Sequence, residues 1–371
     1  MKNYQVFKTV LHQKSIDNVN EVLKSGWIGL GPKSAEFETK FAEYVGSKYC
    51  IGLNSATSAL HLALKVIGVG PGDEVISTPI TFVSTNHAIL YCGATPVFAD
   101  VLVNGNLDPD SVESKITKNT KAIMVVHYSG CPANLDRFYE ISRQYNIPVI
   151  EDCAHACGAE YRGRKIGGTG LIHCFSFHAV KNLPMGDGGA ITTNNPIYAQ
   201  KLKELRWLGI NKTTYDRTSV PHATAPSYLW DYNVDEIGYK YHINDIAAAI
   251  GLGELEYIDE SNEHRGKIAK IYQEQLNILD ITVPVPEQHI KSSYHFQPIL
   301  INNRDEVVAK LKEKGISPGV HYKRNDMFPM YPKTELPGAE SFWKRELTLP
   351  IHLEITTEDA MYIAQTLKEL I

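Results

Sequence analysis

Short apolar runs that alternate with helix-forming segments constrain the fold of this chain more than any other feature of its sequence. The predicted strands lie at residues 50–54, 73–79, 95–101, 121–130, 147–155, 173–178 and 189–194. Residues 14–30 are predicted to form a helix followed by a turn, and the spacing of three and four between apolar residues predicts a helix at 34–46. Further helices are predicted at 55–68, 81–93, 134–146 and 195–209. This alternation predicts an α/β domain with a mostly parallel sheet. In such sheets, ligands bind at the carboxyl ends of the strands.

The C-terminal third follows a different pattern. One long helix over 243–278 is expected to leave the first domain. A strand, a helix, a strand and a capped closing helix are then expected at 292–301, 304–315, 317–322 and 356–370. We therefore predict a large α/β domain over 1–245, and a connecting helix with a small α+β domain over 246–371. The polar, aromatic segment 210–235 has no period, and irregular segments of this length are usually functional or disordered.

Composition excludes several classes of protein. The net charge is −5, so no general positive field attracts nucleic acid or an anionic membrane. The N-terminus has no apolar core typical of a signal peptide, and no apolar window is long enough to span a bilayer. We expect a cytoplasmic protein. The six cysteines form no CxxC pair, which argues against a zinc ribbon, and we predict small buried thiols and no metal site.

Polar residues gather where the predicted strands end. Asp152 ends an apolar run, and burying its carboxylate there is costly unless the carboxylate meets a cation or a donor. Strand alternation places Ser176 and His178 on one face. Lys181 follows that strand, in "CFSFHAVKNLPMGDGGAI", and can reach the same edge of the sheet. The glycines that follow allow a tight turn beside this lysine.

Two further features point to the same edge. The stretch "NSATSALHL" opens a helix with hydroxyls and free amides, which makes a ready anion site around residues 55–57. Phe82 lies early in the next predicted helix. Each residue alone has an ordinary structural explanation, such as a solvated lysine, a capping aspartate or a core phenylalanine.

One chemistry needs all of these groups together. Pyridoxal phosphate (PLP) requires a lysine amine for its Schiff base, a carboxylate beside the pyridine nitrogen, a phosphate cradle and an aromatic plate. Lys181, Asp152, the 55–57 turn with Ser176, and Phe82 match these four requirements in order and spacing.

Across nearly its whole length the sequence resembles the DegT/DnrJ/EryC1/StrS family of sugar aminotransferases. The matching stretches are "GWIGLGPKSAEFETKFAEYVG", "LNSATSALHLAL", "PGDEVISTPITFVSTNHAILYCGATPVFADV", "VVHYSGCPANLD", "VIEDCAHACGAEYRGRKIG", "CFSFHAVKNLPMGDGGAITTN" and "EIGYKYHINDIAAAIGLGELE". The resemblance implies the fold type I aminotransferase architecture, with a large seven-stranded domain and a small C-terminal domain. It also implies a homodimer whose active sites lie at the subunit interface.

The resemblance assigns roles to individual residues. Lys181 is expected to bind PLP covalently and to move the proton between cofactor and sugar. Asp152 is expected to pair with the ring nitrogen, His155 to lie near the phenolic oxygen, and Phe82 to stack on the ring. The expected phosphate contacts are Ala56, Thr57 and Ser176. Ala56 stands where relatives often have glycine, which a helical backbone tolerates.

Other assignments from the resemblance leave alternatives open. The stretch with Lys240 and Asn244 matches a loop that reaches the neighbouring subunit's cofactor. Trp27 lies in a segment that is near the sugar in relatives but could be only a turn. His321 and Tyr322 match residues that approach the substrate, and a structural role explains them equally well.

The expected reaction transfers the amino group of L-glutamate to a nucleotide-linked 4-keto-6-deoxy sugar, with pyridoxamine phosphate as the amino-carrying form, for surface polysaccharide, lipopolysaccharide or glycan biosynthesis. His178, three residues before Lys181, favours amination at C4 over C3. A C3 keto-sugar, a 4-keto-pentose, and a cofactor-bound regulatory protein of the same fold remain alternatives. A Rossmann oxidoreductase needs G-x-G-x-x-G after the first strand, and "IGLNSATSAL" lacks it.

Overall fold

A seven-stranded sheet forms the centre of the computed structural model, which describes residues 2–211, 232–278 and 280–371. Most of the aperiodic segment 210–235 thus lies outside the described residues. In spatial order the strands are β2 (Tyr49–Leu53), β10 (Gly189–Thr193), β9 (Ile172–Ser176), β6 (Val149–Asp152), β5 (Thr120–Val126), β3 (Glu74–Ser77) and β4 (Thr95–Phe98). Neighbouring strands are parallel except that β10 runs antiparallel to both β2 and β9. The expected α/β fold with a mostly parallel sheet is confirmed.

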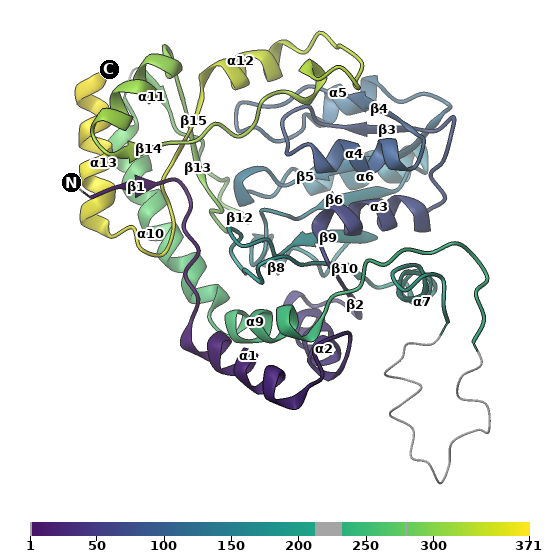
Figure 1. The fold of residues 1–371 in the computed structure, drawn as a ribbon. Coiled ribbons are helices and arrows are strands. Elements are labelled where there is room, and N and C mark those ends of the chain that lie inside the picture. Colours follow the sequence, from purple (N-terminus) through teal and green to yellow (C-terminus); the bar gives the residue numbers. More distant parts are fainter. Residues whose placement is uncertain (1, 212–231, 279) are drawn as a thin grey trace.

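Helices cover both faces of this sheet (Figure 1). On one face lie α3 (Ala56–Val66), α4 (Ser84–Tyr91) and α7 (Pro196–Leu205). On the other lie α2 (Pro32–Val45) and α6 (Leu135–Tyr145). The period of two in β9 sorts its side chains, because Cys174 packs under α3 whereas Phe175 packs against Phe41 of α2. Ser176 therefore faces the side away from Phe175 and Phe177, as the sequence predicts.

A second, smaller unit contains most of the C-terminal residues. Its antiparallel sheet has the order β11 (Ile281–Thr282), β13 (Gln297–Ile301), β15 (Glu346–Leu349). It packs with α10 (Ile258–Leu276), α11 (Arg304–Glu313) and α13 (Thr357–Leu370) in one hydrophobic cluster. The N-terminus joins this end of the molecule, because β1 (Tyr4–Gln5) pairs with β14 (Ile316–Ser317) before the chain crosses to α1 (Gln13–Ser25) (Figure 1). The domain division at residue 245 stays a prediction.

Several short elements have no clear sequence signal. They are α5 (Pro109–Ser114), β7 (Glu160–Tyr161), β8 (Arg164–Lys165), β12 (Ile290–Lys291) and α12 (Pro337–Arg345). The six cysteines are all free and buried, as predicted. Among the described residues, every helix is too short or too polar to cross a membrane.

The single helix predicted over 243–278 is wrong. The chain forms α9 (Asp245–Leu255) and then α10, with a break at Tyr257. The ring of Tyr257 stacks on His12, with 4.1 Å between the ring centroids. The break lets α9 pack along α1 and α2 while α10 turns away to pack against α13.

The strand predicted over 292–301 begins only at Gln297. The preceding residues bend toward the large sheet, because Ser293 N and His295 N donate to the carbonyls of Gly130 and Ser129. Tyr294 between them has a positive φ of 47°. The strand predicted over 317–322 likewise ends at Ser317, which leaves the following residues free to enter the site described below.

Asp245 joins two segments that are more than 200 residues apart. Its buried carboxylate accepts hydrogen bonds from Gly31 N (2.9 Å), Lys33 N (3.0 Å) and Ser34 N (2.9 Å) at the start of α2. The Ser34 hydroxyl adds a fourth, at 2.6 Å. A carboxylate at this place satisfies orphan amides and faces the positive end of the helix dipole.

We expect Asp245→Ala to lower the free energy of unfolding by about 2–3 kcal/mol, because it leaves buried donors without an acceptor. Urea denaturation followed by circular dichroism measures the change. Asp305→Ala is the matched control, since Asp305 is also in the first turn of a helix but its side chain is 90% exposed. An equal loss in both variants would contradict the role given to Asp245.

Candidate active site

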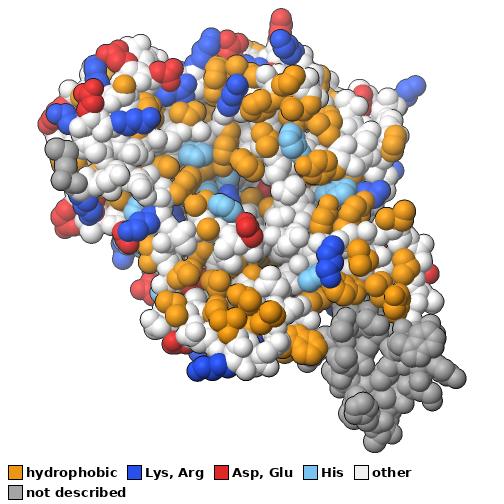
Figure 2. Space-filling view, viewed as in Figure 1, with side chains coloured by type: hydrophobic (Ala, Val, Ile, Leu, Met, Phe, Trp, Pro, Cys, Tyr) orange, Lys and Arg blue, Asp and Glu red, His pale blue; other side chains and the backbone are white. Residues whose placement is uncertain are grey.

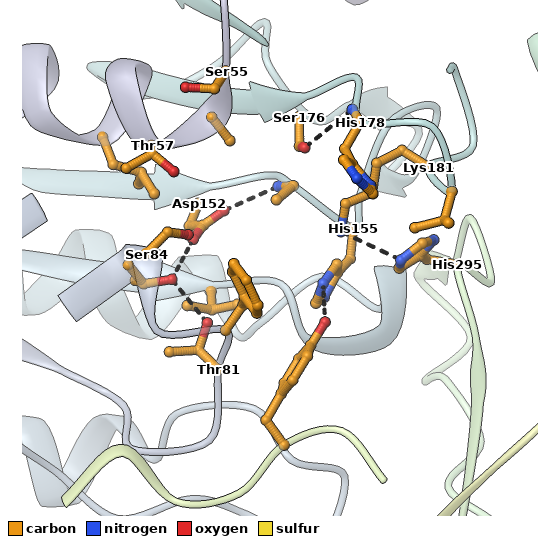
Figure 3. Close-up of a pocket in the computed structure, with 18 of the residues that line it drawn as sticks. Ser55, Thr57, Thr81, Ser84, Asp152, His155, Ser176, His178, Lys181 and His295 are labelled. Carbon is orange, nitrogen blue, oxygen red and sulfur yellow. Dashed lines mark hydrogen bonds between the residues drawn. The ribbon is translucent and has the colours of Figure 1, made fainter. Parts of the chain in front are cut away.

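A cavity of about 400 Å³ lies at the carboxyl edge of the large sheet, where residues of the small unit close one side. Figure 2 shows histidine side chains around the hollow on this face, and Figure 3 shows the residues inside it. Nine of the residues predicted from the sequence line this one cavity. They are Ala56, Thr57, Phe82, Asp152, His155, Ser176, Lys181, His321 and Tyr322.

Lys181 lies in the turn that follows β9. Its backbone N–H donates to His178 O (2.8 Å), which turns the chain back toward the sheet. The side-chain amine enters the cavity and lies 3.4 Å from His295 Nε2 (Figure 3). Burial lowers the pKa of this amine to about 8, although the charge of Asp152 opposes the shift. The amine is therefore far more nucleophilic near neutral pH than an exposed lysine.

Asp152 is the last residue of β6, and its carboxylate is buried. Ala154 N donates to Oδ1 (3.0 Å), and the Thr85 hydroxyl donates to Oδ2 (2.9 Å). Burial raises the pKa of this carboxyl despite both hydrogen bonds. Asp152 forms no salt bridge among the described residues, although the charge of Lys181 acts on it, so a protonated ring nitrogen in the cavity would supply a paired cation.

The first turn of α3 forms one end of the cavity. Ser55 caps the helix by accepting from Ser58 N (3.1 Å), and the amides of Ala56 and Thr57 begin the helix. Ala56 is already helical, so the backbone accommodates its methyl group. A Cβ on Gly189 would lie 2.4 Å from the Ser55 carbonyl, so only glycine lets β10 pass this close. The free amides and the nearby Ser176 hydroxyl can hold a phosphate.

Aromatic rings and histidines form the opposite wall. His155 Nε2 lies 3.0 Å from the Tyr322 hydroxyl, whereas its Nδ1 is buried without a partner among the described residues. Burial holds the pKa of His155 well below its usual value, so the ring is neutral and one nitrogen awaits a polar group. Phe82 precedes α4 rather than lying within it, and its side chain is 58% exposed at the cavity mouth.

Three predicted residues lie outside this cavity. Trp27 donates from its ring nitrogen to Leu30 O (3.3 Å). The Lys240 amine lies over the ring of Trp207, 3.5 Å from its centroid. Asn244 caps α9 by accepting from Ala247 N (2.9 Å). Their roles toward substrate or a neighbouring subunit stay predictions.

The structure also adds residues that sequence reasoning missed. Thr85 and His295 contact Asp152 and Lys181 directly, and Phe7 and Asp187 line the cavity. Thr85 carried a usable signal, since it lies in the first turn of a helix that starts at the same sheet edge. His295 carried none, because the segment around it reads as a strand.

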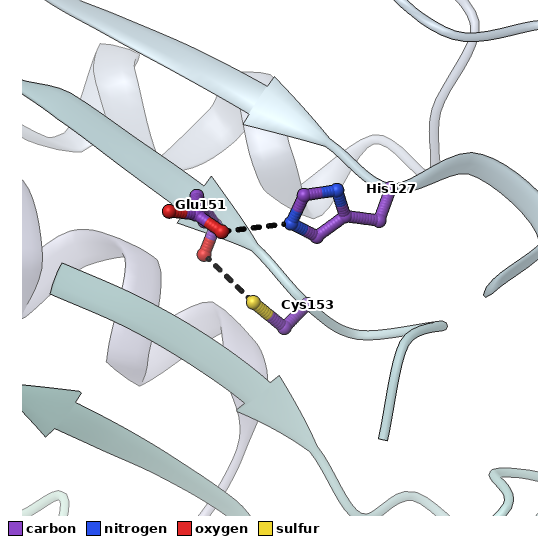
Figure 4. Close-up of side chains that lie close together, drawn as sticks. All are labelled: His127, Glu151 and Cys153. Atoms are coloured by element: carbon purple, nitrogen blue, oxygen red, sulfur yellow. Dashed lines mark hydrogen bonds and ion pairs between the residues drawn. The ribbon is translucent and has the colours of Figure 1, made fainter. Parts of the chain in front are cut away.

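A second cluster behind the sheet edge contains His127, Glu151 and Cys153 (Figure 4). Ala133 N donates to His127 Nδ1 (3.1 Å), so the His127 proton is on Nε2 and points at Glu151 Oε2 (3.0 Å). Burial raises the pKa of the Cys153 thiol well above its usual value, and the thiol points at the Glu151 carbonyl (3.5 Å). The potential ligand atoms of His127, Glu151 and Cys153 already have hydrogen-bond partners, so we assign no metal to this cluster.

Among the described residues, the cavity thus combines a reactive amine, a buried carboxylate with no salt bridge, an anion cradle and a ring nitrogen with no hydrogen-bond partner. These groups match the aldehyde, pyridine nitrogen, phosphate and phenolic oxygen of PLP.

Known proteins resemble this chain in sequence and in fold. The spore coat polysaccharide biosynthesis protein SpsC of Bacillus subtilis is 34% identical over 377 residues, with 98% of this chain and 95% of SpsC covered. The structure of Helicobacter pylori PseC, an aminotransferase involved in the biosynthesis of pseudoaminic acid, superposes with a TM-score of 0.92 at 30% identity and covers 100% of this chain and 99% of PseC. The PLP form of Spr1654 from Streptococcus pneumoniae gives 0.90 at 29% identity, with 100% and 98% coverage.

The profile of one protein family matches residues 10–368, nearly the whole chain. The structural matches are to fold type I sugar aminotransferases, which agrees with the sheet order and the cavity described above. The chain belongs to the DegT/DnrJ/EryC1/StrS aminotransferase family, a family of PLP-dependent enzymes.

Proposed function

We propose that this enzyme transfers the amino group of L-glutamate to C4 of a nucleotide-linked 4-keto-6-deoxy sugar. The product would serve surface polysaccharide, lipopolysaccharide or glycan biosynthesis in the cytoplasm. The kinship with SpsC and PseC supports a sugar substrate. His178 lines the cavity three residues before Lys181, which supports C4 over C3.

The observation that carries the proposal is the pairing of Lys181 with Asp152 in one cavity. When bound, PLP supplies an aldehyde that takes up the amino group and a ring that delocalises the resulting electron pair. The Lys181 amine would hold PLP through the aldehyde carbon and, when free, would carry a proton to the sugar carbon. The Asp152 carboxylate would keep the ring nitrogen protonated. Burial disfavours a lone carboxylate charge, and pairing with the protonated nitrogen would neutralise that charge.

The remaining residues orient the ligands. The amides of Ala56 and Thr57 and the Ser176 hydroxyl would hold the phosphate, and the unpartnered Nδ1 of His155 would serve the phenolic oxygen. Phe82, exposed in the cavity lining, would cover the ring.

His321 and Tyr322 present polar atoms to the sugar from the small unit. Thr348 lies between His321 Nδ1 (2.7 Å) and Glu346 Oε1 (2.6 Å), which fixes the His321 ring in the cavity wall. The Tyr322 hydroxyl is held by His155.

We propose that the enzyme is a homodimer with shared active sites. Lys240 and Asn244 lie outside the cavity of their own chain, which supports a role for their segment in a second copy. We also propose that Trp27 lies near the sugar, as the resemblance to the family implies.

The test uses purified enzyme with PLP, glutamate and a panel of UDP-, dTDP- and GDP-4-keto-6-deoxy sugars. We expect 2-oxoglutarate and a sugar product that carries an amino group at C4, identified by mass spectrometry and NMR. Conversion of glutamate without turnover of any 4-keto-6-deoxy sugar would contradict this substrate and favour a C3 keto-sugar or a 4-keto-pentose.

We expect the rate at which the cofactor-free enzyme binds PLP to rise with pH and to level off above pH about 8. Only the free amine reacts with the aldehyde, and burial has moved the pKa of Lys181 down to about 8. Stopped-flow absorbance between 410 and 430 nm follows the reaction, at about the wavelengths typical of lysine-bound PLP. Lys181→Ala should show no such band, and a rate that rises up to pH 10 would contradict the lowered pKa.

We expect Asp152→Asn to retain PLP and to lose transamination by a factor of about 10² to 10³. An amide cannot hold a proton on the ring nitrogen, so the ring no longer stabilises the electron pair. Single-turnover reaction of the loaded variant with glutamate measures the loss, and the visible band confirms that cofactor is bound. A variant that transaminates at the normal rate would contradict the role of Asp152.

A further inference from the structure

A chain of buried polar side chains runs from two backbone carbonyls to the Lys181 amine. Asn262 Nδ2 donates to Cys157 O (3.0 Å), and Asn182 Nδ2 donates to both Asn262 Oδ1 and Ser293 O, each at 2.7 Å. His295 Nδ1 lies 3.1 Å from Asn182 Oδ1, and His295 Nε2 lies 3.4 Å from Lys181 Nζ.

The donors and acceptors in this series of hydrogen bonds can be arranged in only one way. The carbonyls of Cys157 and Ser293 can only accept, so Asn262 and Asn182 must turn their NH₂ groups toward them. Asn182 then offers only its oxygen to His295. His295 must therefore carry its proton on Nδ1, which leaves the Nε2 lone pair facing the lysine.

The surroundings keep this histidine neutral. The His295 side chain is buried, and burial holds its pKa well below the usual value. The charges of Lys181 and Arg265, and of His155 and His321 when these are protonated, oppose a second proton on the ring. Asp152 is the acidic group whose charge acts on Lys181.

Stacking fixes the plane of the ring. The Phe7 ring stacks on the His295 ring, with 5.3 Å between the centroids and 15° between the planes. His155 also stacks on His295, at 4.8 Å and 23°. The Nε2 atom is thus fixed both in direction and in protonation.

We propose that His295 is a positioning residue for Lys181. Its neutral Nε2 accepts a hydrogen bond from the amine and so directs the amine lone pair at the bound cofactor. No proton is transferred in this hydrogen bond, because the hydrogen stays bonded to the lysine nitrogen. The inference rests on the proposed role of Lys181 and extends it to a residue of the small unit.

Two substitutions separate the hydrogen bond from the ring. His295→Phe keeps a stacking ring but removes the acceptor. His295→Gln can donate N–H to Asn182 and present its carbonyl oxygen to the amine, as the histidine does. His352→Phe is the matched control, since His352 is a buried histidine of the small unit whose Nδ1 accepts from Glu354 N (3.3 Å).

The measurement is the pH dependence of PLP binding by the cofactor-free variants, confirmed by borohydride reduction and mass spectrometry at Lys181. In His295→Phe we expect the midpoint to fall by about one pH unit, because the ammonium loses a hydrogen-bond acceptor. We also expect the plateau rate to fall about tenfold, because the amine is no longer oriented. In His295→Gln and His352→Phe, the midpoint of the pH dependence of PLP binding should equal that of the wild-type enzyme.

An unchanged midpoint and plateau in His295→Phe would overturn the inference, and so would a glutamine variant that behaves like the phenylalanine variant. If His295→Phe does not fold, ¹⁵N-histidine NMR of the wild-type protein tests the inference instead. We expect the His295 ring to be protonated on Nδ1 and unprotonated on Nε2 between pH 6 and 8. The other tautomer would refute the proposal. If the unchanged enzyme does not bind PLP at Lys181, the proposed function itself fails, and that outcome is distinct from these.

Discussion

The candidate active site depends on the burial of the Lys181 amine and the Asp152 carboxylate in one cavity at the edge of a mostly parallel sheet. Burial disfavours both charges, so the pKa of Lys181 falls and the pKa of Asp152 rises. A bound cofactor with a protonated ring nitrogen and an electrophilic carbon would fit both pKa shifts. The nitrogen would favour the charged carboxylate of Asp152, and the carbon would react with the free amine of Lys181.

Strand alternation lets two adjacent acids have different environments. Asp152 faces the cavity and is held by Thr85 and Ala154 N. Glu151 faces the other side of the sheet, where His127 donates to it. Burial alone would raise the pKa of Glu151, but His173, His127 and the Tyr139 hydroxyl together outweigh burial, so the pKa is lowered. One carboxylate is satisfied by the protein, and only the other is left for a ligand.

The small unit completes the site from a distance. His295, His321 and Tyr322 all come from residues beyond 290 and close the wall opposite the sheet. They reach it because the chain bends at Tyr294 and because the strand expected over 317–322 stops at Ser317. Asp245 has a similar long-range role, since it holds the start of α2 and the segment that contains Trp27.

The sequence by itself determined the seven strands, their alternation with helices, and the positions of Lys181, Asp152 and Ser176, because each depends on a local period and on the place where a strand ends. It also placed Phe82 and the 55–57 turn at the same edge. Only the tertiary structure decided the break at Tyr257, the bend before Gln297 and the contact of His295 with Lys181. The physical reason is that the protonation of His295 depends on acceptors near residues 157, 182 and 293, and no local pattern records which distant groups meet.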